Sequence, residues 1–227
     1  MEPAARETGV HATSRLRPVA LEGPAGALEG LLQERSAHDH AGTAVVCHPH
    51  PLHGGTLHNK VVHRVASVLH ELGAAVLRFN FRGVGKSAGE FADGAGKLED
   101  ARAALRWMEA RYPDAKPWAA GFSFGAWVAA RLAASEPRIE RLILVAPPVA
   151  SHDFSVLTSA TVPKLVIQGT RDDQCPLPAL EDVFPGWAAP KALVRVGGAS
   201  HFFDRQLAAL GDALRRGLSA IGPSPRP

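Results

Sequence analysis

The chain has 227 residues, of which 46% are hydrophobic, which is enough for one sizeable core in a single α/β domain. Its formal net charge is +3, and its Lys and Arg residues form no dense run, which argues against a nucleic-acid-binding surface. Two cysteines, Cys47 and Cys175, are too few for a disulfide framework and suit a cytoplasmic protein with reduced thiols. No apolar run approaches about 18 residues, and the N-terminus lacks a signal-peptide core, so neither a membrane span nor secretion is predicted.

The two ends of the chain differ in composition from the rest. Residues 1–14 are mostly polar, and residues 221–227 are rich in Pro and Gly. We expect both to be disordered or flexible tails, with residues 15–220 forming one domain.

The first strand patterns cover residues 16–22, 27–35 and 43–47, and the third runs into the loop HPHPLHGGT. A helix is predicted next, because apolar residues recur at steps of four, three and four from Val61 to Leu72. We expect Thr56 to cap this helix and Gly73 to end it.

The rest of the chain continues the alternation. Strand patterns follow at residues 74–81, 117–121, 141–146, 164–169 and 191–196. Helix patterns lie at residues 98–108, 124–135, 178–187 and 203–218. The segment RLILVA at 141–146 is apolar throughout, as in a parallel sheet that is covered on both faces. The sequence therefore predicts an α/β fold with a mostly parallel sheet of about eight strands flanked by helices.

The segment GVGKS at 83–87 matches the end of a phosphate-binding loop, G-x-x-x-x-G-K-[ST]. The first glycine of that motif would fall at Asn80, and glycine-rich sequence follows Ser87 where the motif requires a helix. We interpret the segment as a turn after a strand, in which Lys86 contributes little. No nucleotide and no other cofactor is predicted.

The segment GFSFG at 121–125 matches G-x-S-x-G, and it lies between a predicted strand and a predicted helix. In that context a tight turn projects the Ser123 hydroxyl above the sheet, and the helix N-terminus favours developing negative charge. Gly121 and Gly125 remove side chains that would collide in so sharp a turn. The pattern predicts Ser123 as a nucleophile.

A carboxylate and a histidine follow later predicted strands. The acid lies in VIQGTRDDQCP, as Asp172 or Asp173, and His201 lies in VRVGGASHFF. The order Ser, Asp, His brings the three side chains to the carboxyl ends of parallel strands. His201 would take the proton of Ser123, and the acid would orient the imidazole.

Four sequence blocks together resemble the α/β-hydrolase superfamily, especially its small bacterial serine hydrolases. These blocks are HPHPLHGGTLHNK, RFNFRGVGKS, GFSFG and SHFF. The resemblance implies the α/β-hydrolase fold. Its G-x-x-D-x-x-x-P loop, framed here by Gly169 and Pro176, selects Asp172 over Asp173, which stays as a reserve.

An oxyanion hole requires two backbone N–H groups. One is expected from Phe124, directly after the nucleophile, whereas Pro49 and Pro51 have no N–H to donate. Similarity to the His-Gly-x loops of the family places the second donor at His50. Phe202 and Phe203, next to the histidine, are candidates for an acyl pocket.

Two rival interpretations involve the same segments. His48, His50 and His53 lie within six positions and raise the question of a zinc site, but we interpret them as a loop shaped around the oxyanion hole and predict no metal. Cys175 lies in the acid loop, and we interpret it as a small buried residue rather than a nucleophile.

The interval from Pro147 to Pro163, where a cap would insert, is too short to fold a cap domain. We therefore predict an open site and a serine hydrolase of the carboxylesterase type, which acts on small acyl esters. Thioesters, lactones, dienelactones and small peptides stay as alternative substrates, and a non-catalytic hydrolase-fold binding protein is the alternative from another class. The expected partner is a small-molecule ester, with no nucleic acid or membrane, and the choice between monomer and homodimer stays open.

Overall fold

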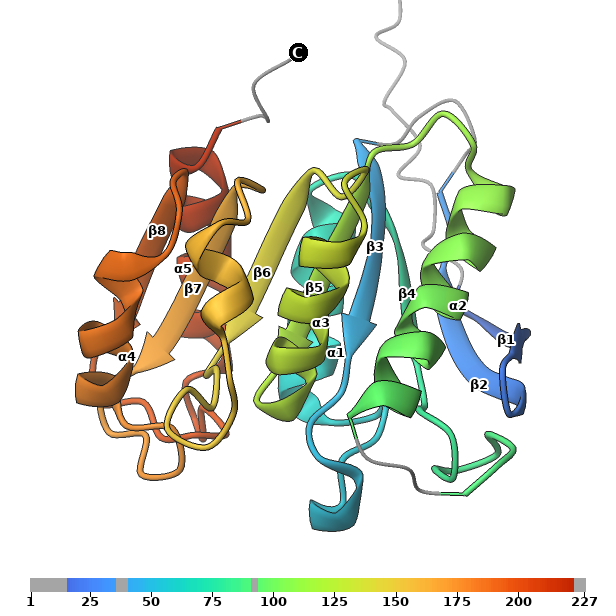
Figure 1. The fold of residues 1–227 in the computed structure, drawn as a ribbon, viewed down its shortest axis with the longest axis horizontal. Coiled ribbons are helices and arrows are strands. Elements are labelled where there is room, and N and C mark those ends of the chain that lie inside the picture. The colour runs from blue at the N-terminus through green and yellow to red at the C-terminus, as the bar shows by residue number, and fades with distance from the viewer. Residues whose placement is uncertain (1–15, 36–40, 91–93, 223–227) are drawn as a thin grey trace, which may run out of the picture.

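The computed structural model describes residues 16–35, 41–90 and 94–222 of the chain. Its centre is an eight-stranded sheet with the order β1-β2-β4-β3-β5-β6-β7-β8 (Figure 1). The strands are β1 (Leu16–Gly23), β2 (Gly26–Gln33), β3 (Gly42–Cys47), β4 (Ala74–Phe79), β5 (Pro117–Phe122), β6 (Arg141–Val145), β7 (Lys164–Gly169) and β8 (Lys191–Val196). β1 and β2 join the sheet antiparallel, and all pairs from β4 to β8 are parallel. This confirms the predicted α/β fold.

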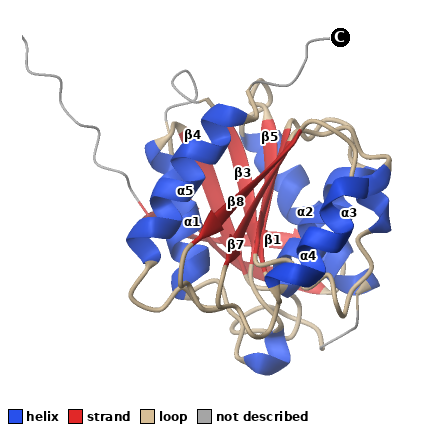
Figure 2. Cartoon of the chain, turned by 90° about the vertical axis from the view of Figure 1, so that its left-hand side faces the viewer, coloured by secondary structure: helices blue, strands red, loops and turns tan. Residues whose placement is uncertain are grey.

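Helices cover both faces of the sheet. They are α1 (Lys60–Glu71), α2 (Ala95–Arg111), α3 (Phe124–Ser135), α4 (Leu177–Val183) and α5 (Leu207–Ala220), with short 3₁₀ turns η1 (Pro51–His53), η2 (Ser155–Thr158) and η3 (Phe184–Gly186). Figure 2 shows α1 and α5 on one face, and α2, α3 and α4 on the other. Such a sandwich buries both faces of the central strands, which explains their apolar sequences.

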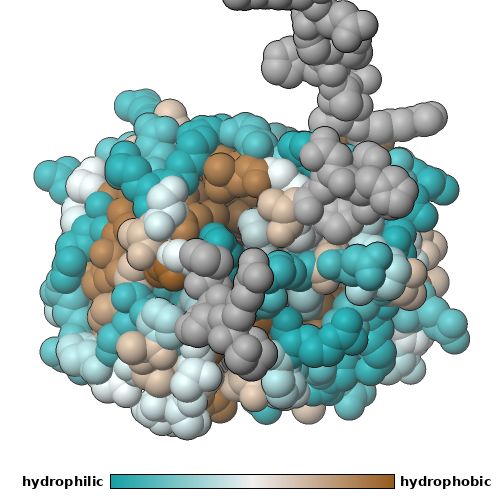
Figure 3. Space-filling model, turned by 90° about the horizontal axis from the view of Figure 1, so that it is seen from above, coloured by the Kyte–Doolittle hydropathy of each residue, from teal (hydrophilic) through white to brown (hydrophobic). Residues whose placement is uncertain are grey.

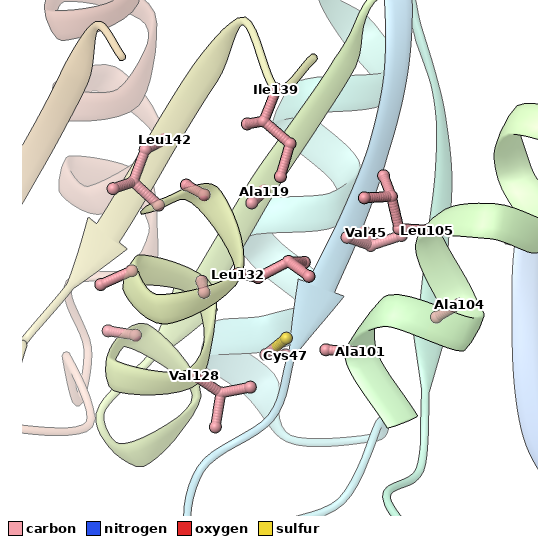
Figure 4. Close-up of a cluster of buried hydrophobic side chains, with 14 of the residues drawn as sticks. Val45, Cys47, Ala101, Ala104, Leu105, Ala119, Val128, Leu132, Ile139 and Leu142 are labelled. Carbon is pink, nitrogen blue, oxygen red and sulfur yellow. The ribbon is translucent and has the colours of Figure 1, made fainter. Parts of the chain in front are cut away.

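The hydrophobic core consists of two clusters, one on each side of the sheet. Along β3, Val45 and Cys47 point toward α2 and α3, whereas Ala44 and Val46 belong to the cluster under α1 and α5. Figure 4 shows the first cluster, in which Val45 and Leu105 approach each other from strand and helix. The strands are thereby held from both sides, which fixes the loops at their carboxyl ends.

The start of α1 differs from its prediction. Asn59, not Thr56, caps the helix, because its Oδ1 accepts hydrogen bonds from the N–H groups of Val61 and Val62. Thr56 Oγ1 instead accepts from the N–H of His58, in the turn that precedes the helix. The predicted apolar face is also one residue too long, since Leu72 lies past the last turn and is 39% exposed.

The connection between β6 and β7 is described in full and contains η2 as its one regular element. It forms no cap domain, as predicted. At the opposite edge, where the strands begin, a hollow of about 610 Å³ is lined mainly by apolar residues from the end of α3 and from the loops before β6, β7 and β8. Figure 3 looks onto this edge and shows hydrophobic residues gathered there.

The predicted N-terminal tail, residues 1–14, lies outside the described residues, as do residues 223–227 of the predicted C-terminal tail. Within the described ranges, every helix is too short or too polar to cross a membrane.

Candidate active site

Ser123 occupies the turn between β5 and α3. Its backbone angles, φ 53° and ψ −122°, lie in a region that costs a residue with a Cβ about 1–3 kcal/mol. Its N–H donates to the carbonyl of Val145 on the neighbouring strand, which anchors the turn. The strained turn lifts the hydroxyl out of the sheet, as the G-x-S-x-G pattern predicts.

Two glycines make this turn sterically possible. A Cβ on Gly121 would lie 2.0 Å from the carbonyl oxygen of Gly125. A Cβ on Gly125 would lie 2.2 Å from the carbonyl oxygen of Cys47, at the end of β3. The start of α3 therefore packs directly against the end of β3, where the oxyanion loop begins.

The structure brings Ser123, Asp172 and His201 together. His201 Nε2 is 3.1 Å from Ser123 Oγ, and its Nδ1 is 2.9 Å from Asp172 Oδ2. His201 and Asp172 are buried, whereas Ser123 is partly accessible. Asp173 is exposed, so the carboxylate that reaches the histidine is that of Asp172.

The Asp172 carboxylate is held by donors on its own loop and on the preceding strand β7. Its Oδ1 accepts from the N–H groups of Gln174 and Cys175, and its Oδ2 accepts from Gln168 Nε2 at 3.0 Å. Sequence reasoning did not find Gln168. The available signal was its position as a polar residue directly after the apolar run LVI near the end of β7.

The loop after β3 is organised by His48, which is fully buried. Nε2 accepts from the N–H of Phe81, and Nδ1 lies 2.7 Å from the carbonyl oxygen of Pro49, so Nδ1 carries the proton and donates. Burial lowers the pKa of His48 to about 4, which keeps the ring neutral. His48 thus connects this loop to the turn after β4.

The two predicted oxyanion donors are neighbours. The rings of His50 and Phe124 lie 4.8 Å apart at their centroids. Phe124 is the first residue of α3, where a backbone N–H has no acceptor one turn earlier in the helix. Their role as donors stays a prediction.

Two further rings, those of Trp127 and His152, pack together beside Phe124. His152 packs edge-on against both Phe124 and Trp127, at 5.7 and 5.0 Å between centroids. Trp127 Nε1 donates to the carbonyl of Asp153, which ties α3 to the loop after β6. Sequence reasoning did not find His152, because its loop carries no motif.

The two candidate pocket residues differ in their surroundings. Phe202 is half-buried and packs edge-on against His201, with 5.0 Å between centroids. Phe203 is fully buried in the core cluster under α5. The structure therefore places Phe202 beside the triad and Phe203 in the core.

The described residues contain one group with metal-ligand chemistry, formed by Asp172, Cys175 and His201, whose ligand atoms lie within 4.8 Å of one another. The group does not include the histidines of the HPHP loop. Both oxygens of Asp172 already accept hydrogen bonds, and burial, followed by the Asp172 charge, raises the pKa of the Cys175 thiol to about 12. A protonated thiol is a poor ligand and a poor nucleophile, which favours a structural role for Cys175.

The segment RFNFRGVGKS joins the end of β4 to α2 and to the loop before α1. Arg82 forms a buried ion pair with Asp100 of α2, at 2.7 Å between Nη2 and Oδ1, and Lys97 donates to the carbonyl of Arg82. Asn80 accepts from the N–H of Leu57 and donates to Glu29. No helix follows the segment directly, so it is not built as a phosphate-binding loop.

Comparison with known proteins shows which family and which relatives the chain is similar to. Residues 44–168 match the model of the family described as serine aminopeptidase, S33. An uncharacterized protein of Rickettsia prowazekii is 36% identical over 194 residues, which span 82% of this chain and 81% of that protein.

Solved structures give the same result for the fold. An alpha-beta serine hydrolase homologue from Coxiella burnetii has 40% sequence identity and a TM-score of 0.85, covering 93% of this chain and 100% of that one. A serine hydrolase without lid from Xanthomonas campestris has 39% identity and a TM-score of 0.84, covering 96% and 100%. The eight-stranded sheet and the absence of a cap agree with this likeness.

Proposed function

Because the chain belongs to the serine aminopeptidase S33 family of hydrolases and has the α/β-hydrolase fold, we propose that it cleaves small acyl esters through Ser123, His201 and Asp172. The observation that carries the proposal is the position of His201, whose two ring nitrogens contact Ser123 Oγ and the Asp172 carboxylate. A carboxylate at Nδ1 selects the tautomer in which Nε2 has a free electron pair. That electron pair faces the hydroxyl it would deprotonate.

Acylation follows from this arrangement. As Ser123 Oγ attacks the ester carbonyl, its proton passes to His201 Nε2, and a tetrahedral oxyanion forms. The N–H groups of Phe124 and His50 are the proposed donors to that oxygen. His201 then gives the proton to the departing alcohol oxygen, and an acyl-enzyme remains on Ser123.

Deacylation repeats the steps with water. His201 accepts a proton from water, the hydroxyl attacks the acyl carbonyl, and the proton returns to Ser123 Oγ as the acid leaves. Thioesters, lactones and small peptides would follow the same steps, because the triad determines the reaction class and not the acyl group. The partial accessibility of Ser123 and the short interval between β6 and β7 support small, accessible esters.

A fluorophosphonate probe tests the proposal directly. The wild type should be labelled at Ser123, as identified by mass spectrometry, and Ser123→Ala should not be labelled. Ser155→Ala, which removes an exposed serine on η2, is the matched control and should be labelled like the wild type. Absence of labelling in the wild type would favour a hydrolase-fold binding protein instead.

Substrate panels distinguish the bond types. Nitrophenyl esters, thioesters and aminoacyl nitroanilides of similar size should be compared by kcat/KM. We expect the nitrophenyl esters to be turned over fastest. A preference for the anilides, which model peptide bonds, would overturn the ester assignment while leaving the triad in place.

A further inference from the structure

A groove with basic walls lies on the face of the sheet that α1 and α5 cover. It has a volume of about 470 Å³ and is lined by His58, Lys60, His63, Arg64, Leu207 and Ala208. It lies between the first turns of α1 and α5, and four of its six lining residues have basic side chains. No acidic residue lines it.

Phe202 connects the groove to the reaction centre. Its ring lies 5.0 Å from that of His201, and the Lys60 ammonium of the groove lies 5.9 Å from the Phe202 ring centroid. The chain segment that starts at His50, whose ring packs against Phe124, continues eight residues to His58 on the groove wall. A ligand arm of several atoms can therefore extend from the reacting carbonyl past Phe202 into the groove.

Arg64 is the main charge of the groove. The Lys60 ammonium is paired with Asp204, so its charge is neutralised locally. Arg64 Nε donates to the carbonyl of Leu207 at 2.9 Å, and its other N–H groups have no hydrogen-bond partner among the described residues. Those groups can bind an oxyanion in the fork geometry that guanidinium favours.

Residues of α5 determine where the Arg64 side chain of α1 lies. A Cβ on Gly211 would lie 2.3 Å from Arg64 Nη2, so the absence of a side chain there leaves room for the guanidinium. The contact with Leu207 fixes its other end. An arginine held in place in this way loses less conformational entropy on binding than a free surface side chain.

We propose that the groove binds an anionic arm of the substrate, a carboxylate or phosphate, while the scissile carbonyl lies at Ser123. The proposal rests on the proposed esterase function and specifies its substrate class. His58 and His63 would add imidazole N–H groups to the guanidinium of Arg64. The expected substrates are esters or thioesters whose acyl chain ends in an anion several atoms from the carbonyl.

Two esters of equal chain length test this preference. The mono-nitrophenyl ester of adipic acid carries a terminal carboxylate, and nitrophenyl hexanoate does not. At low salt the wild type should favour the adipate ester by about tenfold in kcat/KM. Arg64→Gln should bring the ratio of the two kcat/KM values near one. Arg64→Lys keeps the positive charge but loses the paired N–H groups of guanidinium, so it should give an intermediate ratio. Arg106→Gln removes an exposed arginine from α2, on the opposite face, and should keep the wild-type ratio.

A binding measurement separates this proposal from the failure of catalysis. Monomethyl adipate and hexyl phosphate should bind to Ser123→Ala protein in calorimetric titrations, and methyl hexanoate should bind more weakly. Tighter binding of one anion identifies whether the groove favours carboxylate or phosphate. The proposal would be overturned, even if the esterase function holds, by either of two results. One is an equal kcat/KM of the wild type for the two esters, and the other is anion binding that Arg64→Gln leaves unchanged.

Discussion

At the residue scale, two adjacent aspartates offer a matched pair of variants. Asp172 is buried against His201, and Asp173 is exposed one position later. Asp172→Asn should lower kcat for nitrophenyl esters by about 10³–10⁴-fold, because the amide no longer holds the imidazole in the reactive tautomer. Asp173→Asn should stay within about twofold of the wild type. Equal effects of both variants would contradict the assignment of the acid.

His48 predicts a pH dependence of stability. Its folded-state pKa of about 4 lies below the ordinary histidine value, so the unfolded chain binds a proton that the folded chain rejects. The stabilising contribution is complete above about pH 6.5 and is lost as the pH falls toward 4. Between pH 7 and 4.5, the wild type should lose about 2 kcal/mol more unfolding free energy than His48→Gln.

Urea unfolding at the two pH values measures this difference. His70→Gln is measured beside His48→Gln as a comparison variant. Burial also lowers the pKa of His70, whose ring lies in the last turn of α1 and not in the loop after β3. An identical pH response in wild type and His48→Gln would show that His48 does not titrate in this range.

The three candidate catalytic residues could be predicted from the sequence to lie together, but their supporting residues could not. Ser123, Asp172 and His201 each stand in a short motif after an apolar strand, so their convergence follows from the parallel sheet. Gln168 supports Asp172 through a side-chain hydrogen bond, and His48 supports the oxyanion loop through contacts with Phe81 and Pro49. Such contacts depend on three-dimensional register, which no local pattern contains.

At the element scale, the junction of β5, α3 and β3 is the most constrained point of the site. Gly125→Ala should destabilise the fold by about 3 kcal/mol or more, because its Cβ would overlap the Cys47 carbonyl and backbone must move. The displaced elbow should also lower kcat/KM at least about 100-fold. Chemical denaturation and ester kinetics measure the two effects.

Gly186 provides the control for that substitution. A Cβ there would meet no atom within 4 Å, so Gly186→Ala should change the unfolding free energy by less than about 0.5 kcal/mol. If the two variants behave alike, steric contact at the elbow is not what requires a glycine.

Strands and helices were predicted more accurately than their caps. All eight strands lie where the strand patterns indicated. The signal is strongest for β3 to β7, because these central strands are buried on both faces. The predicted start of α1 was wrong, because Thr56 and Asn59 are both good capping residues. The sequence also does not show that the short turn η1 precedes the helix, which begins only after Asn59. Similarly, α5 begins at Leu207 rather than at 203, after Phe203 and Arg205 adopt positive φ.

At the scale of the whole molecule, the central feature is the missing cap. The segment between β6 and β7 contributes η2 and the rim residue His152, and it does not cover Ser123, which remains partly accessible. Phe202 and the rings around Phe124 supply the apolar contact near the nucleophile. An acyl chain can therefore be buried over its first few carbons, and the remainder meets solvent.

This architecture predicts how rate depends on acyl length. A buried methylene contributes about 0.8 kcal/mol, which is about fourfold in kcat/KM. If an enclosed pocket held all the methylenes by which octanoate exceeds acetate, kcat/KM would rise by roughly 3.5 orders of magnitude. For the open site we expect a rise of less than about fiftyfold that levels off after the first two or three carbons. Nitrophenyl esters from acetate to octanoate, kept below their micelle concentrations, measure the curve. A steady increase through octanoate would show that the chain encloses its substrate more fully than an uncapped α/β-hydrolase fold allows.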